Sequence, residues 1–116
     1  MGERIFLVYV TFPDRATAEA TVRTAVERRL AACGNALPGV RSIYRWKGTV
    51  ETADEVLVFF KTTEGSLPAV RRFILDSHPY EVPEIVATPV VEGNPAYLDW
   101  VRESCGSADE PVTGNA

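Results

Sequence analysis

The sequence predicts an α+β fold, a ferredoxin-like βαββαβ sandwich with a long hairpin between its second and third strands and an extra C-terminal helix. Strand-like and helix-like stretches alternate in that order along the chain. Two strands, at residues 4–12 and 56–60, are apolar on both faces, which suits the centre of a sheet. The last strand contains Pro89, which suits an edge. Together these features favour the strand order 4-1-3-2.

The first strand covers residues 4–12, and Pro13 ends it. Asp14 can cap the helix that follows, because its carboxylate can accept a hydrogen bond from a backbone N–H of the first turn. Apolar side chains at helical spacing predict that helix over residues 16–30, and we expect it to end by Gly34.

A hairpin over residues 40–63 is the most distinctive part of the chain. Lys47-Gly48 lies between two β-prone runs, as the two-residue turn of a hairpin does. A turn at that point pairs Arg41 with Asp54, two opposite charges, across the strands.

The second arm of this hairpin is unusually long. Residues 50–63 would span roughly 45 Å as an unbroken strand, at about 3.3 Å per residue. We therefore expect a bend or bulge near Ala53-Asp54. A small domain cannot cover so long an arm, so the tip should protrude, and its aromatic side chains Tyr44 and Trp46 need a partner surface.

The second half of the chain repeats the helix–strand alternation. A helix begins at or beside Ser66, with Pro68 in its first turn, and ends before Pro79, which disfavours helical geometry in the preceding residue. The fourth strand is expected over residues 85–91. A last helix opens at Asn94-Pro95.

These elements form a single domain over residues 1–104. A chain of 116 residues with 46% hydrophobic residues can bury a sizeable core. From Cys105 onward the composition changes to small and polar residues, so we expect a disordered tail over residues 105–116.

Charge and composition exclude several classes of partner. A net charge of −4 argues against nucleic acid, since phosphate binding needs a basic face. No apolar run approaches the roughly 20 residues of a membrane span, and the first residues continue into a strand without signal-peptide features, so we expect no membrane partner. The two cysteines form no CxxC motif, which favours free thiols and a cytoplasmic location.

The central strands also predict self-association. The helices of such a sandwich cover one face of the sheet, yet residues 4–12 and 56–60 are apolar on both faces. An apolar sheet face exposed to water is an interaction surface. We expect another copy of the chain to cover it.

Five stretches carry a family likeness: VYVTFPDRATAEATVRTAVERRLAACGNALPG (8–39), SIYRWKGTVE (42–51), FKTT (60–63), SHPYEVPEIVATPV (77–90) and YLDWV (97–101). In combination they resemble the CutA family of divalent-cation tolerance proteins. The resemblance implies a ferredoxin-like protomer in a homotrimer whose long hairpins cross neighbouring subunits. It also implies binding of copper or other divalent cations and a role in metal tolerance, without an established reaction. The implied trimer is similar in shape to the PII signalling trimers.

The candidate metal ligands are His78, Cys33, Glu81 and Glu84. His78 is the only histidine, Cys33 ends the LAAC stretch, and the two glutamates lie three and six residues after His78. Copper(II) favours imidazole nitrogen with oxygen ligands, and one imidazole per chain should bind it weakly. Two other interpretations stay open: His78 as a helix-terminating residue, and Cys33 as a buried structural thiol.

A second function, from another class, also remains open. The chain could be a PII-like trimeric signalling or scaffold protein that binds a small molecule or a protein at a subunit interface. Aromatic and charged side chains able to form either a ligand pocket or an interface core are Tyr44, Trp46, Glu51, Lys61, Tyr80 and Glu84. We expect no enzymatic activity, because the sequence contains no GxSxG, HExxH or Walker motif.

Overall fold

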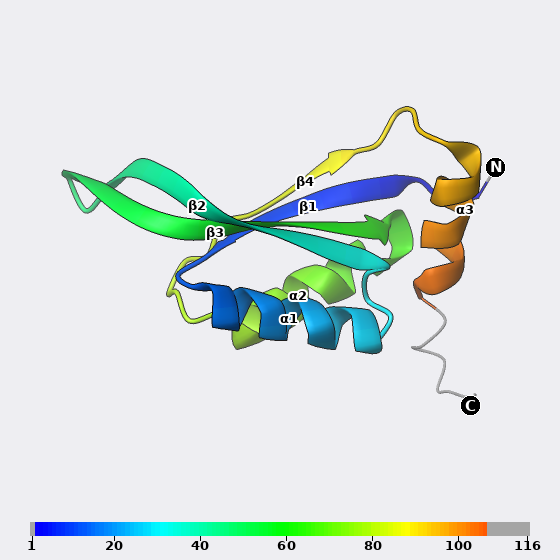
Figure 1. The fold of residues 1–116 in the computed structure, drawn as a ribbon, viewed down its shortest axis with the longest axis horizontal. Helices are drawn as coiled ribbons and strands as arrows, with labels where there is room; N and C mark the ends of the chain where they lie inside the picture. The colour runs from blue at the N-terminus through cyan, green and yellow to red at the C-terminus, as the bar shows by residue number, and fades with distance from the viewer. Residues whose placement is uncertain (1, 107–116) are drawn as a thin grey trace.

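The computed structural model describes residues 2–106 of the chain and confirms the predicted α+β class (Figure 1). The elements follow the expected order, with one short 3-10 turn added: β1 (Ile5–Phe12), α1 (Arg15–Glu27), β2 (Cys33–Trp46), β3 (Thr49–Thr63), η1 (Glu64–Ser66), α2 (Leu67–Ser77), β4 (Ile85–Pro89) and α3 (Pro95–Ser104). None of the helices within the described residues has the length and apolarity needed to cross a membrane.

The four strands form one sheet in the order β2-β3-β1-β4, which is the predicted order. Neighbouring strands are antiparallel, and β1 pairs with both β3 and β4. β4 is an edge strand and ends at Pro89, two residues earlier than expected. Because proline cannot donate a backbone hydrogen bond, its place at the end of an edge strand costs the sheet little.

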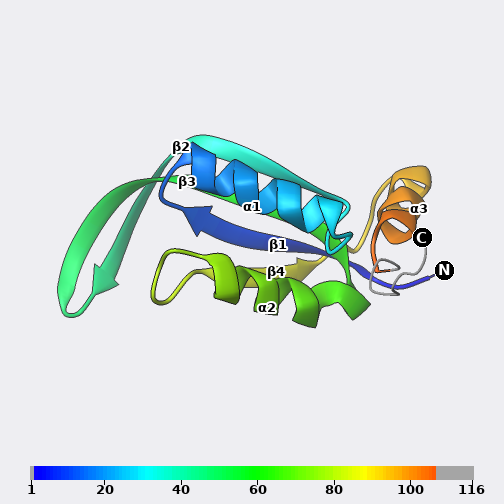
Figure 2. The same ribbon diagram turned by 90° about the horizontal axis from the view of Figure 1, so that it is seen from below.

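The core lies between the sheet and helices α1 and α2, which lie side by side against the same face (Figures 1 and 2). Alternate residues of β1 and β3 point into it, as the two-residue period of a strand requires. The fully buried members include Val10, Phe12, Phe60, Val70 and Ile74. Burial of each such side chain stabilises the fold by about 1.5–3 kcal/mol.

The hairpin of β2 and β3 protrudes beyond this sandwich (Figure 1). Its turn is at Lys47-Gly48, where both residues have positive φ, 51° and 83°, as a type I′ turn requires. The predicted register is confirmed: Arg41 lies opposite Asp54, and Arg41 Nη1 is 2.8 Å from the Asp54 carboxylate.

Two local features differ from expectation. Helix α1 ends at Glu27 because Arg29 adopts φ 60°, and the N–H groups of Arg29 and Leu30 donate to carbonyls in the last turn of the helix, a Schellman motif. The expected position for such a stop was Gly34. β2 begins at Cys33, seven residues before the predicted start of the hairpin at residue 40. The bulge lies on β2, between Leu37 and Val40, instead of near Ala53.

The sheet face opposite α1 and α2 is called the open face here. Its side chains from β1 and β3 are half-buried in the single chain, and they are largely apolar: Leu7, Tyr9, Leu57, Phe59 and Lys61. Tyr9 and Phe59 are in edge-to-face contact, with ring centroids 5.0 Å apart. Leu37 and Val86, which extend this face onto β2 and β4, are exposed.

Helix α3 packs at the far end of the sheet from the hairpin tip (Figure 1). Asn94 caps it by accepting a hydrogen bond from the Ala96 N–H at 3.1 Å. Cys105, where we expected the tail to begin, is only 7% exposed, and the Gly106 N–H donates to the Arg29 carbonyl. The rest of the expected tail, residues 107–116, lies outside the described part of the chain.

Candidate functional site

His78 ends helix α2 and is held by hydrogen bonds at both ring nitrogens. Its Nε2 lies 2.7 Å from the Thr11 carbonyl oxygen, and its Nδ1 lies 3.0 Å from the Tyr80 backbone nitrogen. A carbonyl can only accept and an N–H can only donate, so the hydrogen is on Nε2 and the Nδ1 lone pair faces Tyr80. The ring also stacks on Phe12 at 4.7 Å. In this arrangement neither nitrogen offers a lone pair to a metal ion.

Cys33 lies in a different part of the sheet. It pairs with Lys61 at the start of β2, and its Sγ is 3.5 Å from the Tyr97 hydroxyl. This hydrogen bond, followed by burial, raises the pKa of Tyr97 to about 12. Thr11, the partner of His78, is opposite Leu57, four residues along β3 from Lys61. At about 3.3 Å per residue, roughly 13 Å of sheet separates the two positions.

Glu81 and Glu84 lie in the loop at residues 79–84, after His78, and both are exposed. Among residues 2–106, no three His, Cys, Asp or Glu side chains lie close enough together to hold a metal ion. One protomer therefore does not bring the four candidate ligands His78, Cys33, Glu81 and Glu84 together. The metal site remains a prediction.

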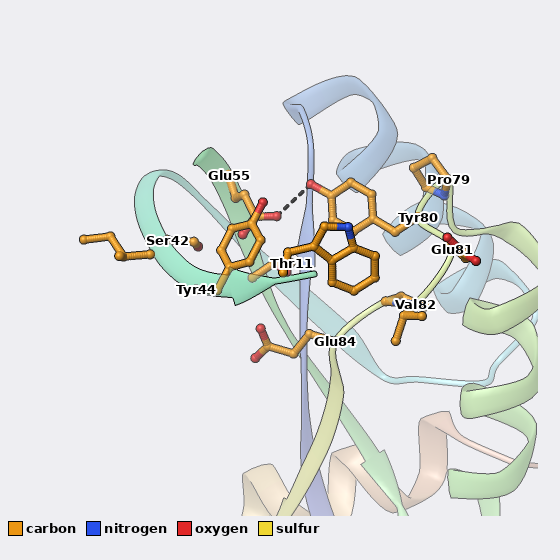
Figure 3. A pocket seen from close by; sticks show the side chains of 12 residues that line it. Thr11, Ser42, Tyr44, Glu55, Pro79, Tyr80, Glu81, Val82 and Glu84 are labelled. Carbon is orange, nitrogen blue, oxygen red and sulfur yellow. Dashed lines mark hydrogen bonds between the residues drawn. The ribbon is translucent and has the colours of Figure 1, made fainter. Parts of the chain in front are cut away.

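A cavity of about 790 Å³ opens between the hairpin and the 79–84 loop (Figure 3), and we call it the hairpin cavity. Its lining residues are Thr11, Ser42, Ile43, Tyr44, Trp46, Glu55, Pro79, Tyr80, Glu81, Val82, Pro83 and Glu84. Four of the side chains proposed from sequence for a pocket or interface are among them: Tyr44, Trp46, Tyr80 and Glu84. Glu51 and Lys61 are not.

Glu55 is the one charged lining residue of this cavity that was not predicted from the sequence. Its side chain is 8% exposed, and its carboxylate accepts a 2.7 Å hydrogen bond from the Tyr80 hydroxyl. Burial, and then this hydrogen bond, raise the pKa of Tyr80, so the phenol keeps its proton and donates it. The one available signal was an acidic residue directly before the apolar run at 56–60.

The fold and the cavity define a class: a small ferredoxin-like domain with an overlong hairpin, an uncovered apolar sheet face and an acidic aromatic cavity. The profile of the CutA1 divalent ion tolerance protein family matches residues 6–104. The chain therefore belongs to the CutA family.

Sequence relatives agree with this assignment. The chain is 47% identical over 100 residues to the divalent-cation tolerance protein CutA of Thermus thermophilus, covering 86% of this chain and 97% of that protein. It is 45% identical over 105 residues to human protein CutA, covering 90% of this chain and 59% of the human protein. The chain thus spans only about three fifths of the length of its human relative.

Solved structures share the same fold. The divalent cation tolerance protein Cut A1 of Thermus thermophilus superimposes with a TM-score of 0.86 at 46% identity, over 88% of this chain and 99% of that one. CutA1 from Oryza sativa gives a TM-score of 0.87 at 36% identity, over 90% of this chain and 95% of that one.

Proposed function

We propose that the protein binds divalent cations, copper first, and acts in cytoplasmic metal tolerance as a homotrimer without catalytic activity. The observation that carries the proposal is the match to the CutA1 divalent ion tolerance family over residues 6–104. Since the described residues of one protomer assemble no set of three metal ligands, a strong site would need ligands from neighbouring copies.

The open face supports self-association. Leu57, Phe59 and Tyr9 are half-buried in the single chain, and Leu37 and Val86 beside them are exposed. A second copy placed there would remove this apolar surface from water, which favours association at about 25 cal/mol per Å² before the entropic cost is counted. The protruding hairpin offers each copy an arm with which to reach a neighbour (Figure 1).

Copper binding at His78 should be weak. The Nδ1 lone pair is occupied by the Tyr80 N–H, so a metal ion at that atom must displace a hydrogen bond. Glu81 and Glu84 are exposed in the adjacent loop and could add oxygen ligands if the loop moves. Cys33 is too far along the sheet to join them within one protomer.

Calorimetric titration with copper(II) tests this proposal. Wild type should bind weakly at pH 7.5 and more weakly at pH 5.5, because protons compete with copper for the ligands. His78→Ala and the double variant Glu81→Gln/Glu84→Gln should each lose affinity. Glu92→Gln, which removes one exposed carboxylate elsewhere, is the matched control. Equal affinity in wild type and His78→Ala would move the site to Cys33, and no binding to wild type would contradict the metal proposal.

The second candidate function is a PII-like signalling or scaffold trimer. The observation that favours it is the hairpin cavity, whose volume of about 790 Å³ falls within the range of about 300–1,000 Å³ usual for small-molecule sites. A thermal-shift screen of metals against organic ions separates the two candidates, since a ligand that binds the folded state raises the melting temperature.

A further inference from the structure

We propose that the hairpin cavity binds a small organic cation through its alkylammonium group. The proposal rests on the second candidate function in one respect only, that the cavity takes a small molecule. It does not depend on copper binding.

The charges around the cavity set the sign of its ligand. Three carboxylates line it, those of Glu55, Glu81 and Glu84, and no lysine or arginine is among its lining residues. Asp14 also lies close enough to act on Tyr80 electrostatically. Phosphates and carboxylates are bound by arginine, lysine or clustered N–H donors. An anion such as a nucleotide would meet repulsion here, whereas a cation would be attracted.

Glu55 lacks a positive partner within the described part of the protein. It is buried, and its one side-chain hydrogen bond among these residues comes from the neutral hydroxyl of Tyr80. No ion pair within residues 2–106 involves it. Buried charges in proteins are normally paired with an opposite charge. A ligand cation would supply that charge from the cavity side.

The walls of the cavity suit an organic cation. Figure 3 shows the Tyr80 hydroxyl directed at the Glu55 carboxylate, with the ring of Tyr44 beside Glu55. Trp46 also lines the cavity, and the ammonium group of Lys47 lies 5.7 Å from the centroid of the Trp46 ring. The faces of such rings carry negative potential and attract ammonium groups, as in the aromatic cages that hold quaternary amines. The apolar part of the ligand would contact Val82 and Ile43.

A metal ion fits the cavity less well. Calcium takes six to eight oxygen ligands at short range, and magnesium needs a near-ideal octahedron. The carboxylates of the described residues are not gathered into a group of three anywhere, so those of Glu55, Glu81 and Glu84 do not converge on one point. A volume of about 790 Å³ is also far larger than a bare ion needs. Aromatic walls with one buried carboxylate therefore favour an alkylammonium group over a metal.

Choline and its neutral isostere 3,3-dimethylbutan-1-ol provide the test, because they have nearly the same shape and differ in charge. Each is titrated into the intact protein by calorimetry at constant ionic strength. We expect choline to bind at least about tenfold more tightly than the isostere. Inorganic phosphate, the anionic probe, should not bind.

Glu55→Gln should weaken choline binding about tenfold while it keeps the shape of the side chain and its contact with Tyr80. The matched control is Asp54→Asn, which removes an equal charge from the next residue of β3. Asp54 is exposed, pairs with Arg41 and does not line the cavity, so its variant should bind choline like wild type. Tyr80→Phe keeps the ring and should retain most of the affinity, whereas Tyr80→Leu should lose it. Thermal melts establish that each variant is folded.

Equal binding of choline and the isostere would overturn the inference, although a small-molecule role for the cavity would stand. Unchanged choline binding in Glu55→Gln, or tighter binding of phosphate, would also overturn it. Failure of choline to bind would overturn this inference, whereas the second candidate function is decided by the thermal-shift screen. The copper titration is read independently of all these results.

Discussion

Replacement of Tyr80 by phenylalanine isolates the contact between Tyr80 and Glu55. The variant keeps the aromatic ring, which lies 4.7 Å from the ring of His78, and removes only the hydroxyl that donates to Glu55 at 2.7 Å. A hydrogen bond to a charged group contributes about 1.5–3 kcal/mol, and loss of the donor leaves a buried carboxylate poorly solvated. Because the cavity admits water beside Glu55, we expect the lower half of that range, about 1.5–2 kcal/mol.

Urea unfolding at pH 7 measures this loss as a shift of the midpoint at unchanged slope. The protein concentration must be fixed, since the stability of an oligomer depends on it. Tyr44→Phe is the control: Tyr44 is 44% exposed, and its hydroxyl makes no hydrogen bond to another residue of the described chain. It should change the free energy of unfolding by less than about 0.5 kcal/mol.

A double-mutant cycle with Glu55→Gln identifies the partner. In the Glu55→Gln background the Tyr80 hydroxyl would donate to a neutral amide oxygen, so its removal should cost about 1 kcal/mol less than in wild type. The reasoning is refuted if Tyr80→Phe costs under about 0.5 kcal/mol, or if its cost is the same whether residue 55 is glutamate or glutamine.

Three further predictions concern the open face, His78 and Cys105. Phe59→Lys places a charge on the open face and should give particles of 12.7 kDa in light scattering instead of the proposed trimer, and a trimer in both proteins would contradict assembly through this face. His78→Ala leaves the Thr11 carbonyl and the Tyr80 N–H without their partner and should cost about 2 kcal/mol in urea unfolding; a cost near zero would mean that water replaces the ring. Burial raises the pKa of the Cys105 thiol above its ordinary value of 9.0, so the unfolded state loses this proton first and stability should fall as pH rises through 9. Cys105→Ala should flatten the fall in melting temperature between pH 8 and 9.5, and an equal slope in both proteins would exclude the thiol as its source.

The candidate site shows where sequence reasoning ends. Tyr44, Trp46 and Tyr80 were predicted to share a pocket or an interface, and the structure places all three around one cavity. Glu55 was not predicted, because an acidic residue before an apolar run usually faces water. His78 and Cys33 could be proposed as ligands of one metal ion because the sequence does not give the distance between their side chains. His78 contacts Thr11, which lies opposite Leu57, whereas Cys33 lies opposite Lys61. These two positions of β3 are four residues, or roughly 13 Å, apart.

The sequence by itself determined the elements, the strand order and the hairpin register. These follow from local rules: two-residue alternation in β1 and β3, a proline that limits β4 to an edge, and a Lys47-Gly48 turn that fixes which residues lie opposite each other. The tertiary structure alone decided where α1 stops and where the bulge lies. Arg29, unlike glycine, gives no sequence signal for the left-handed geometry it adopts, and its side chain donates to the Glu103 carbonyl at 2.7 Å, a contact made only when α3 docks. The burial of Glu55 was decided in the same way, because it depends on the approach of the 79–84 loop to the hairpin, two segments whose contact no local pattern encodes.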